Sequence, residues 1–402
     1  MPNAKPSNAA ADVADVDLLE RKQEHLDQAL LRGRFQGKVV MITGAAGSIG
    51  SELCRQIAGF SPLALVGFDQ AGTALFQLGS ELTQRFPDLV FHAEIGNIAR
   101  LEDVERTIEQ YRPSIVFHAA AYKHVPMLEQ QVVAAVENNI FGTWHVAQAA
   151  GSHRVESLVL ISTDKAVGPA SVLGATKRVA ELLIQEFDKE SETKFVAVRL
   201  GNVIGSSGSV VPIFKRQIAT GGPVTVTHPE MRRYFMTASE AGQLLLYALA
   251  MGSGGEVFVF DMGEPLSILE LARNLIRLSG LQPDSDIQIE FTGVRPGEKL
   301  AEELHKKEEQ LVPTSHPKIY NLLGSESADA PELTPFLKEL KQAVSERDVL
   351  RIIRILKQVV PDYIPSSQVI QHAMSLEKNR GITDDVQDSS RQSVESMLVA
   401  SK

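Results

Sequence analysis

Short apolar runs alternate with amphipathic segments between residues 38 and 263. A continuous apolar run bounded by polar turns predicts a strand buried on both faces, and helical spacing between runs predicts crossover helices. The expected strands are KVVMITG (38–44), LALVGFD (63–69), LVFHAEIGN (89–97), SIVFHAAA (114–121), SLVLIST (157–163), KFVAVRLGN (194–202) and EVFVFDMG (256–263). The alternation predicts an α/β fold, with a doubly wound parallel sheet of the Rossmann type and a smaller C-terminal substrate-binding lobe.

The stretch TGAAGSIGSEL (43–53) places Gly44, Gly47 and Gly50 between the first expected strand and the first crossover helix. Glycines there permit a tight turn, close approach of the main chain to a pyrophosphate, and close packing of helix on strand. The helix N-terminus adds free N–H groups and a partial positive charge. Glycine turns also serve purely structural loops, but the position between strand and helix favours dinucleotide binding.

Asp69 ends the second expected strand, about 20 residues after the glycine turn, where a carboxylate can accept from both hydroxyls of a ribose. No arginine follows it in FDQAGTAL (68–75), so NAD is favoured over NADP; the alternative is that Asp69 caps a loop. Asn97 either hydrogen-bonds an adenine edge or caps the next helix. The expected dinucleotide contacts are Gly44, Gly47, Ser48, Ile49, Gly50, Asp69, Asn97, Ile98, Ala119, Ala120, Ala121 and Lys177.

Composition narrows the class of protein. A net charge of -10 over 402 residues argues against a general nucleic-acid surface, which needs a basic face. The single Cys54 excludes an internal disulfide framework and suits a reducing compartment. The longest apolar run, AGQLLLYALAMG (241–252), is shorter than the roughly 20 residues of a membrane helix, and no export signal is evident. We therefore expect a soluble cytoplasmic protein with no membrane span and no metal site.

The stretch STDKAVGPASVLGATK (162–177) resembles the active-site helix of a nucleotide-dependent oxidoreductase, with Lys177 as its lysine. Such a helix normally carries a proton-transferring tyrosine four residues earlier, and that position here is Leu173. Either activity has been lost or the acid and base lie elsewhere. The run Thr163, Asp164, Lys165, just beyond the fifth expected strand, has the necessary groups; the structural alternative is a surface ion pair.

Several motifs together resemble the extended short-chain dehydrogenase/reductases, and within them the bacterial UDP-N-acetylglucosamine 4,6-dehydratases of polysaccharide biosynthesis. The resemblance covers about residues 17 to 365, and some branches of the family carry methionine in place of the tyrosine. The motifs are TGAAGSIGSEL, FHAAAYKHVPMLE, ENNIFGTWHVAQAA, STDKAVGPASVLGATKRVAEL, RLGNVIGSSGSVVPIF, VTHPEMRRYFMT and FTGVRPGEKLAEEL.

The resemblance implies a catalytic role for each residue of the run. Thr163 would hydrogen-bond the C-4 oxygen of the hexose, Asp164 would act as the acid at C-6 and Lys165 as the base at C-5. Lys177 would donate to the nicotinamide ribose. Lys165 can serve as a base if burial or nearby cations lower the pKa of its amine.

The resemblance also implies where the UDP-sugar binds. Lys123 and His124 would lie near the hexose, and Asn202, Arg233 and Arg295 would hold the UDP diphosphate, for which the planar fork of arginine is suited. Arg232 departs from the threonine usual in the family. We further expect a homo-oligomer.

The chain is expected to divide into four parts. From Asp17 to Arg34 the spacing is helical, and 287–305 is expected to form a strand, a turn and a helix. The parts are an N-terminal tail and helix (1–36), an NAD-binding domain (37–205, with 232–262 returning to it), a nucleotide-sugar-binding lobe (206–231 and 263–365) and a loose C-terminal tail (366–402).

Two other functions stay open. An epimerase on the same scaffold would return the hydride to C-4, and simple 4-epimerisation needs no base at C-5, so Asp164 and Lys165 favour dehydration. A regulatory protein that lost catalysis with its tyrosine would bind NAD without turnover. The configuration of the product at C-5 cannot be read from the sequence.

Overall fold

The computed structural model describes residues 27–324 and 332–379. One large sheet has the order β14-β15-β11-β6-β5-β4-β1-β2-β3. Its strands are β1 (Val39–Thr43), β2 (Ala64–Asp69), β3 (Phe91–Ile95), β4 (Ile115–His118), β5 (Ser157–Thr163), β6 (Lys194–Leu200), β11 (Val257–Phe260), β14 (Gln310–Pro313) and β15 (Ile319–Leu323). All neighbours from β3 to β11 pair in parallel, so the seven expected strands and the doubly wound order are confirmed.

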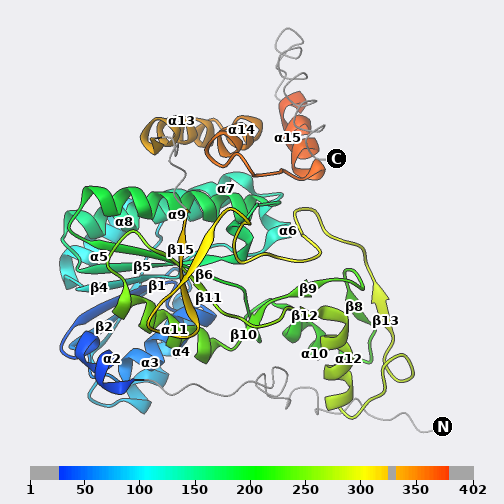
Figure 1. The fold of residues 1–402 in the computed structure, drawn as a ribbon, viewed down its shortest axis with the longest axis horizontal. Helices are drawn as coiled ribbons and strands as arrows, with labels where there is room; N and C mark the ends of the chain where they lie inside the picture. Colours follow the sequence, from blue (N-terminus) through cyan, green and yellow to red (C-terminus); the bar gives the residue numbers. More distant parts are fainter. Residues whose placement is uncertain (1–26, 325–331, 380–402) are drawn as a thin grey trace.

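Helices cover both faces of this sheet (Figure 1). Alternate residues of β1 enter different cores, Val40 and Ile42 on one side and Met41 on the other, as the two-residue period of a strand requires. The Val40 side packs on α2 (Gln28–Phe35), α3 (Ser48–Ala58), α4 (Gly72–Arg85) and α11 (Ala238–Met251). The Met41 side packs on α5 (Leu101–Tyr111), α8 (Gly142–Ser152) and α9 (Val172–Glu190).

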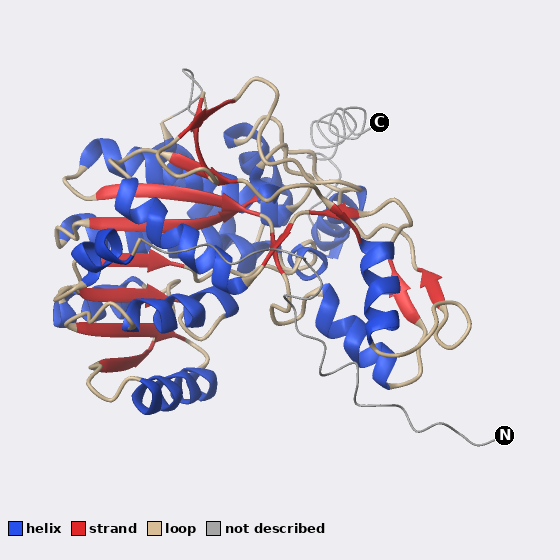
Figure 2. Cartoon of the chain, turned by 60° about the horizontal axis from the view of Figure 1, so that its bottom comes forward, coloured by secondary structure: helices blue, strands red, loops and turns tan. Residues whose placement is uncertain are grey.

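A smaller lobe has its own apolar core, and the arrowheads of the main strands point toward it (Figure 2). It contains α10 (Val210–Ala219), α12 (Ile268–Leu278) and the parallel pair β8 (Val224–Val226) and β13 (Ile289–Phe291). Two short pairs lead into it, β7 (Asn202–Val203) with β10 (Phe235–Met236), and β9 (Arg232–Arg233) with β12 (Leu266–Ser267). Side chains at the carboxyl ends of the strands therefore face the expected substrate lobe.

The expected extent of this lobe is wrong. Residues 310–323, assigned to the lobe, form β14 and β15, which extend the main sheet in antiparallel fashion beyond β11. Beyond them, α13 (Leu333–Ser345), α14 (Val349–Val359) and α15 (Ser367–Asn379) share an apolar core with α9 and α7 (Val132–Val136) on the far side of the molecule. The apolar stripe of α14 is buried in this core, which places the helix against α7, α9, α13 and α15.

The loose tail predicted from residue 366 is also wrong for its first part. Val369, Ile370 and Ala373 of α15 are buried, and that burial stabilises a helix that the polar composition obscured. Residues 380–402 lie outside the described part of the chain. At the N-terminal end, the described portion of the expected helix is α2, and its Leu31 and Phe35 are buried against the main body. Residues 17–26 lie outside the described residues.

The helix expected near residues 298–305 does not form. The main-chain carbonyls of Lys299 and Leu300 accept hydrogen bonds from Arg233, and Leu300 also accepts from the N–H of Arg232, so these carbonyls are not available to a helix. Within the described residues, no helix is long and apolar enough to cross a membrane. The remaining elements are α6 (Val125–Leu128), the π-helix η2 (Glu137–Phe141) and the 3-10 turn η3 (Asp164–Ala166).

Candidate active site

The glycine turn is formed as the sequence predicts. Gly44 has φ +68°, and a Cβ built on it would lie 2.7 Å from the main chain of Ala120, so the turn packs directly on the chain that follows β4. A Cβ on Gly50 would lie 2.1 Å from the carbonyl oxygen of Gly44. Gly47 precedes α3 and supplies no side-chain cap, which leaves the first N–H groups of that helix for an anion.

Asp69 stands against this turn. Its Oδ2 accepts from the N–H of Ala46 and its Oδ1 from the N–H of Ala71, both at 2.9 Å. These are the bonds of a loop cap, and they also hold the carboxylate beside the turn; the ribose contact stays a prediction. Asn97 Oδ1 accepts from the N–H of Ala99 at 2.9 Å, which is the capping alternative for that residue.

The run at the end of β5 is internally hydrogen-bonded around the buried carboxylate of Asp164. Thr163 Oγ1 donates to Asp164 Oδ1 at 2.9 Å, and Lys165 Nζ donates to the same oxygen at 2.9 Å. Lys165 Nζ also donates to Asn202 Oδ1 at 3.2 Å. Asp164 is fully buried, and its Oδ2 has no hydrogen-bond partner among the residues that the structure describes. The alternative of an exposed surface ion pair is therefore wrong.

Two further charged groups complete this cluster. Glu302 Oε1 lies 3.8 Å from Lys165 Nζ and 3.9 Å from Arg233 Nη2, and both Glu302 and Arg233 are buried. Arg233 donates to the carbonyls of Arg232, Lys299 and Leu300. The guanidinium of Arg233 thus holds the chain around residue 300. Its contact with a diphosphate stays a prediction.

The charges around Lys165 determine the pKa of its amine. Burial lowers the pKa of the Lys165 amine, but the carboxylates of Asp164 and Glu302 outweigh it, so the pKa is raised above its usual value. The condition set from the sequence, a lowered pKa of the Lys165 amine, is therefore not met by these residues alone. Burial raises the pKa of the Glu302 carboxyl, partly opposed by Lys165 and Arg233.

Lys177 and Leu173 both lie inside the protein. Lys177 Nζ donates to the main-chain carbonyl of Ile161 at 2.6 Å, and burial lowers the pKa of its amine to about 8. Leu173 belongs to the apolar core shared by α7 and α9. The donation of Lys177 to a nicotinamide ribose stays a prediction.

A network of buried charges lies behind β5, and sequence reasoning missed it. Glu181, one turn after Lys177 on α9, accepts from Ser162 Oγ at 2.6 Å and from two nitrogens of Arg199 at 2.9 Å. Burial raises the pKa of Glu181, but Arg199 outweighs it and brings the value to about 2. Glu309 pairs with Arg199 from the chain before β14. The network fixes Ser162, the neighbour of Thr163. In the sequence, the network is marked only by polar residues at positions that face the core.

The predicted substrate contacts are partly brought together. Asn202 contacts Lys165, and Arg233 joins the same cluster through Glu302. His124 lies against Gly208, because a Cβ built on Gly208 would lie 2.6 Å from His124 Cε1. His124 thus borders the segment that enters the lobe. Burial lowers the pKa of His124, with the nearby cation of Lys123 as a second cause.

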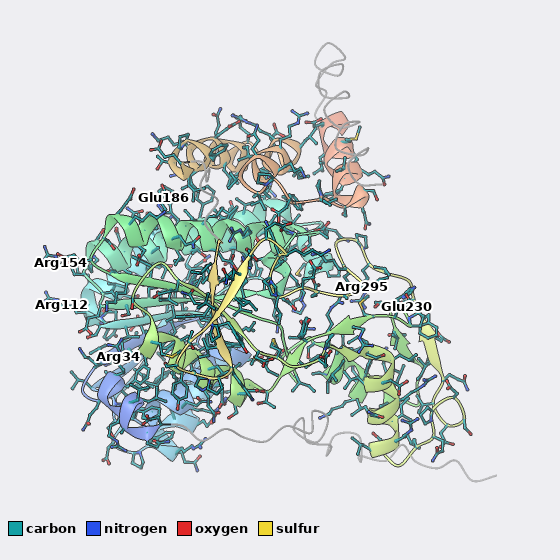
Figure 3. The ribbon with its side chains drawn as sticks, viewed as in Figure 1. Arg34, Arg112, Arg154, Glu186, Glu230 and Arg295 are labelled. Carbon is teal, nitrogen blue, oxygen red and sulfur yellow. The ribbon has the colours of Figure 1, made fainter. Side chains whose placement is uncertain are left out.

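Arg295 lies apart from this cluster. Half of its side chain is exposed, and it pairs with Glu298 at 3.8 Å. Figure 3 shows Arg295 on the chain that returns from β13 toward the main sheet. No hydrogen bond or ion pair between described residues joins it to Arg233 or Asn202. No group of three or more His, Cys, Asp or Glu within residues 27–324 and 332–379 is placed to hold a metal ion.

One family model, "Polysaccharide biosynthesis protein", matches residues 40–323, a range that includes the glycine turn and the run Thr163–Asp164–Lys165. The chain belongs to this polysaccharide biosynthesis family. The probable polysaccharide biosynthesis protein EpsC of Bacillus subtilis is 49% identical over 332 residues, which are 82% of this chain and 55% of EpsC. The chain thus spans about half the length of that relative.

Two further proteins are similar to this chain. The X-ray structure of Pen from Bacillus thuringiensis has a TM-score of 0.66 and 34% identity, covering 71% of this chain and 88% of Pen. A UDP-glucose 4-epimerase of Rickettsia rickettsii is 33% identical over 285 residues, 68% of this chain and 80% of that enzyme. The family is therefore established, while the reaction must be argued from the site.

Proposed function

We propose that the protein is an NAD-dependent nucleotide-sugar 4,6-dehydratase that converts UDP-N-acetylglucosamine to a UDP-4-keto-6-deoxy-N-acetylhexosamine. The observation that carries the proposal is the hydrogen-bonded run Thr163–Asp164–Lys165 at the carboxyl end of β5, whose buried carboxylate has one oxygen without a partner among the described residues. A buried polar atom without a partner calls for an explanation, and a catalytic role is one that fits a carboxylate at the carboxyl end of a strand.

The residues present fit a dinucleotide. Gly44 and Gly50 leave no room for a side chain at the turn, α3 begins with uncapped N–H groups, and Asp69 stands beside the turn with no adjacent arginine. When bound, NAD would remove a hydride from C-4 of the hexose and return it to C-6.

Thr163 and Asp164 can carry one proton through the cycle. The Thr163 hydroxyl already donates to Asp164 Oδ1, so the proton of the C-4 hydroxyl can pass through Thr163 to an ionised Asp164. The neutral acid then gives that proton to the C-6 hydroxyl, which leaves as water. Asp164 ends as it began, and no tyrosine at position 173 is required.

Lys165 is the proposed base at C-5. Oxidation at C-4 acidifies the C-5 proton, which a neutral amine takes up. The resulting ammonium, whose protons exchange with solvent, later donates a proton to the same carbon. Because Asp164 and Glu302 raise the pKa of Lys165, the amine must first lose a proton within the site. The second function, 4-epimerisation, draws support from the epimerase relative but leaves Asp164 without a task at C-6 and Lys165 without a task at C-5.

The test is to incubate the purified protein with UDP-N-acetylglucosamine in deuterated water and to follow the product by NMR. A 4-keto-6-deoxy product with deuterium at C-5 supports dehydration, and its configuration at C-5 is read from the same spectrum. A 4-epimer without deuterium would instead support the epimerase. A protein that binds NAD without turnover would support the regulatory alternative.

A further inference from the structure

The segment 297–302, in the chain that leaves the smaller lobe, lies against the residues that follow β5. Lys299 Nζ donates to the carbonyl of Val167 at 2.8 Å, two residues beyond Lys165. A Cβ built on Gly297 would lie 2.9 Å from Ser171 Cβ, so the segment also packs on the start of α9. Together with the bonds from Arg233, these contacts fix the segment at three points.

These contacts place Glu302 next to Lys165. Glu302 is 7% exposed, and its Oε1 is 3.8 Å from Lys165 Nζ, within ion-pair distance but beyond a direct hydrogen bond. The charged groups that act on Glu302 are Lys165, Asp164, Arg233 and Lys299. A small side-chain movement or one bridging water is enough to connect the two groups.

We propose that Glu302 is a positioning residue for Lys165, accepting the proton that this lysine must lose before its amine can act as the base at C-5. The inference rests on the proposed function. The transfer balances: an ammonium and a carboxylate become a neutral amine and a carboxylic acid. The amine then takes the C-5 proton, and the ammonium later donates a solvent-exchangeable proton to C-5, after which Lys165 and Glu302 ionise again.

Two observations favour Glu302 over bulk water as the acceptor. Lys165 is 17% exposed and already donates to Asp164 and Asn202, so little of its amine faces solvent. Burial raises the pKa of Glu302, which brings its proton affinity closer to that of the lysine and makes the neutral pair more accessible.

The test compares Glu302→Gln with Glu303→Gln, since Glu303 is the adjacent, exposed residue. Turnover, KM and deuterium incorporation at C-5 are measured from pH 6 to pH 10. We expect Glu302→Gln to lower kcat at least about tenfold at pH 7 with a smaller change in KM. The deficit should narrow at high pH, where solvent removes the lysine proton, and Glu302→Asp should retain part of the rate.

Each outcome separates this inference from the proposed function. An active wild type with a Glu302→Gln variant that matches Glu303→Gln at every pH would overturn the role of Glu302 alone. So would an equal loss at all pH values, which indicates a structural role. If Glu302→Gln does not fold, the pH profile of Glu302→Asp decides in the same way. A wild type without dehydration overturns the proposed function, and this inference with it.

Discussion

Gly174 of α9 packs against the main-chain carbonyl of Lys165: a Cβ built on Gly174 would lie 2.2 Å from that oxygen and 2.8 Å from the Cβ of Pro169. The helix that carries Leu173 and Lys177 is thus in direct contact with the turn that carries the proposed base. No side chain fits between them, so the spacing of helix and turn depends on this glycine.

Replacing Gly174 with alanine should therefore be costly. Alanine favours a helix by about 1 kcal/mol, but overpacking against a fixed carbonyl costs typically about 1–3 kcal/mol, so we expect a net loss of stability together with lower turnover. Gly33→Ala in α2 is the matched control, because its Cβ would meet no atom within 4 Å. That variant should be neutral or stabilised by up to about 1 kcal/mol in urea unfolding. Equal behaviour of the two variants would contradict the contact.

Leu173 tests whether the missing tyrosine matters. Leu173→Met nearly conserves volume in the buried core and should cost less than about 1.5 kcal/mol, with turnover retained. Leu173→Tyr overpacks the same core and should not raise turnover by the hundredfold or more that a new general base can supply. Turnover of both variants on UDP-N-acetylglucosamine is the measurement. A large gain with tyrosine over a nearly inactive parent would identify a decayed enzyme.

Asp164→Asn and Lys165→Ala should abolish water loss while leaving UDP-sugar binding largely intact, because both residues act on the hexose in the proposed reaction. Lys165→Ala leaves the fully buried Asp164 without its cation and should cost roughly 3 kcal/mol of stability. Product formation is followed by NMR and binding by calorimetry. Near-normal turnover in both variants would assign the pair a structural role.

Lys177 should make stability depend on pH. Its pKa is about 8 in the folded protein and near 10.5 when unfolded, so between those values the unfolded chain binds more protons. Unfolding free energy should then rise with pH across this window, by up to about 3 kcal/mol from this residue. Lys177→Met should lack this rise. The difference in unfolding free energy between wild type and variant, measured by urea unfolding, should therefore shift in favour of the wild type from pH 8 to pH 10. Parallel curves for the two proteins would refute the assignment.

Local pattern was enough to predict much of this protein. Continuous apolar runs predict the seven parallel strands. A strand covered on both faces is apolar at successive positions, and that pattern is visible without knowing which strands pair with it. The glycine turn is predicted by three glycines placed between a strand and a helix, a spacing that few other conformations require. The run Thr163–Asp164–Lys165 could be placed at the edge of the sheet because it directly follows a strand.

Tertiary structure alone decided how the site is charged and closed. Glu302 lies beside Lys165 because Arg233 and Val167, both distant in sequence, hold the chain around residue 300 in place. The adjacent Asp164 is the larger cause of the raised pKa of Lys165, and Glu302 adds to it; that second contribution could not be read from the sequence. In the same way β14, β15 and α15 carry weak local signals and are stabilised by surfaces that exist only once the main sheet and α9 have formed.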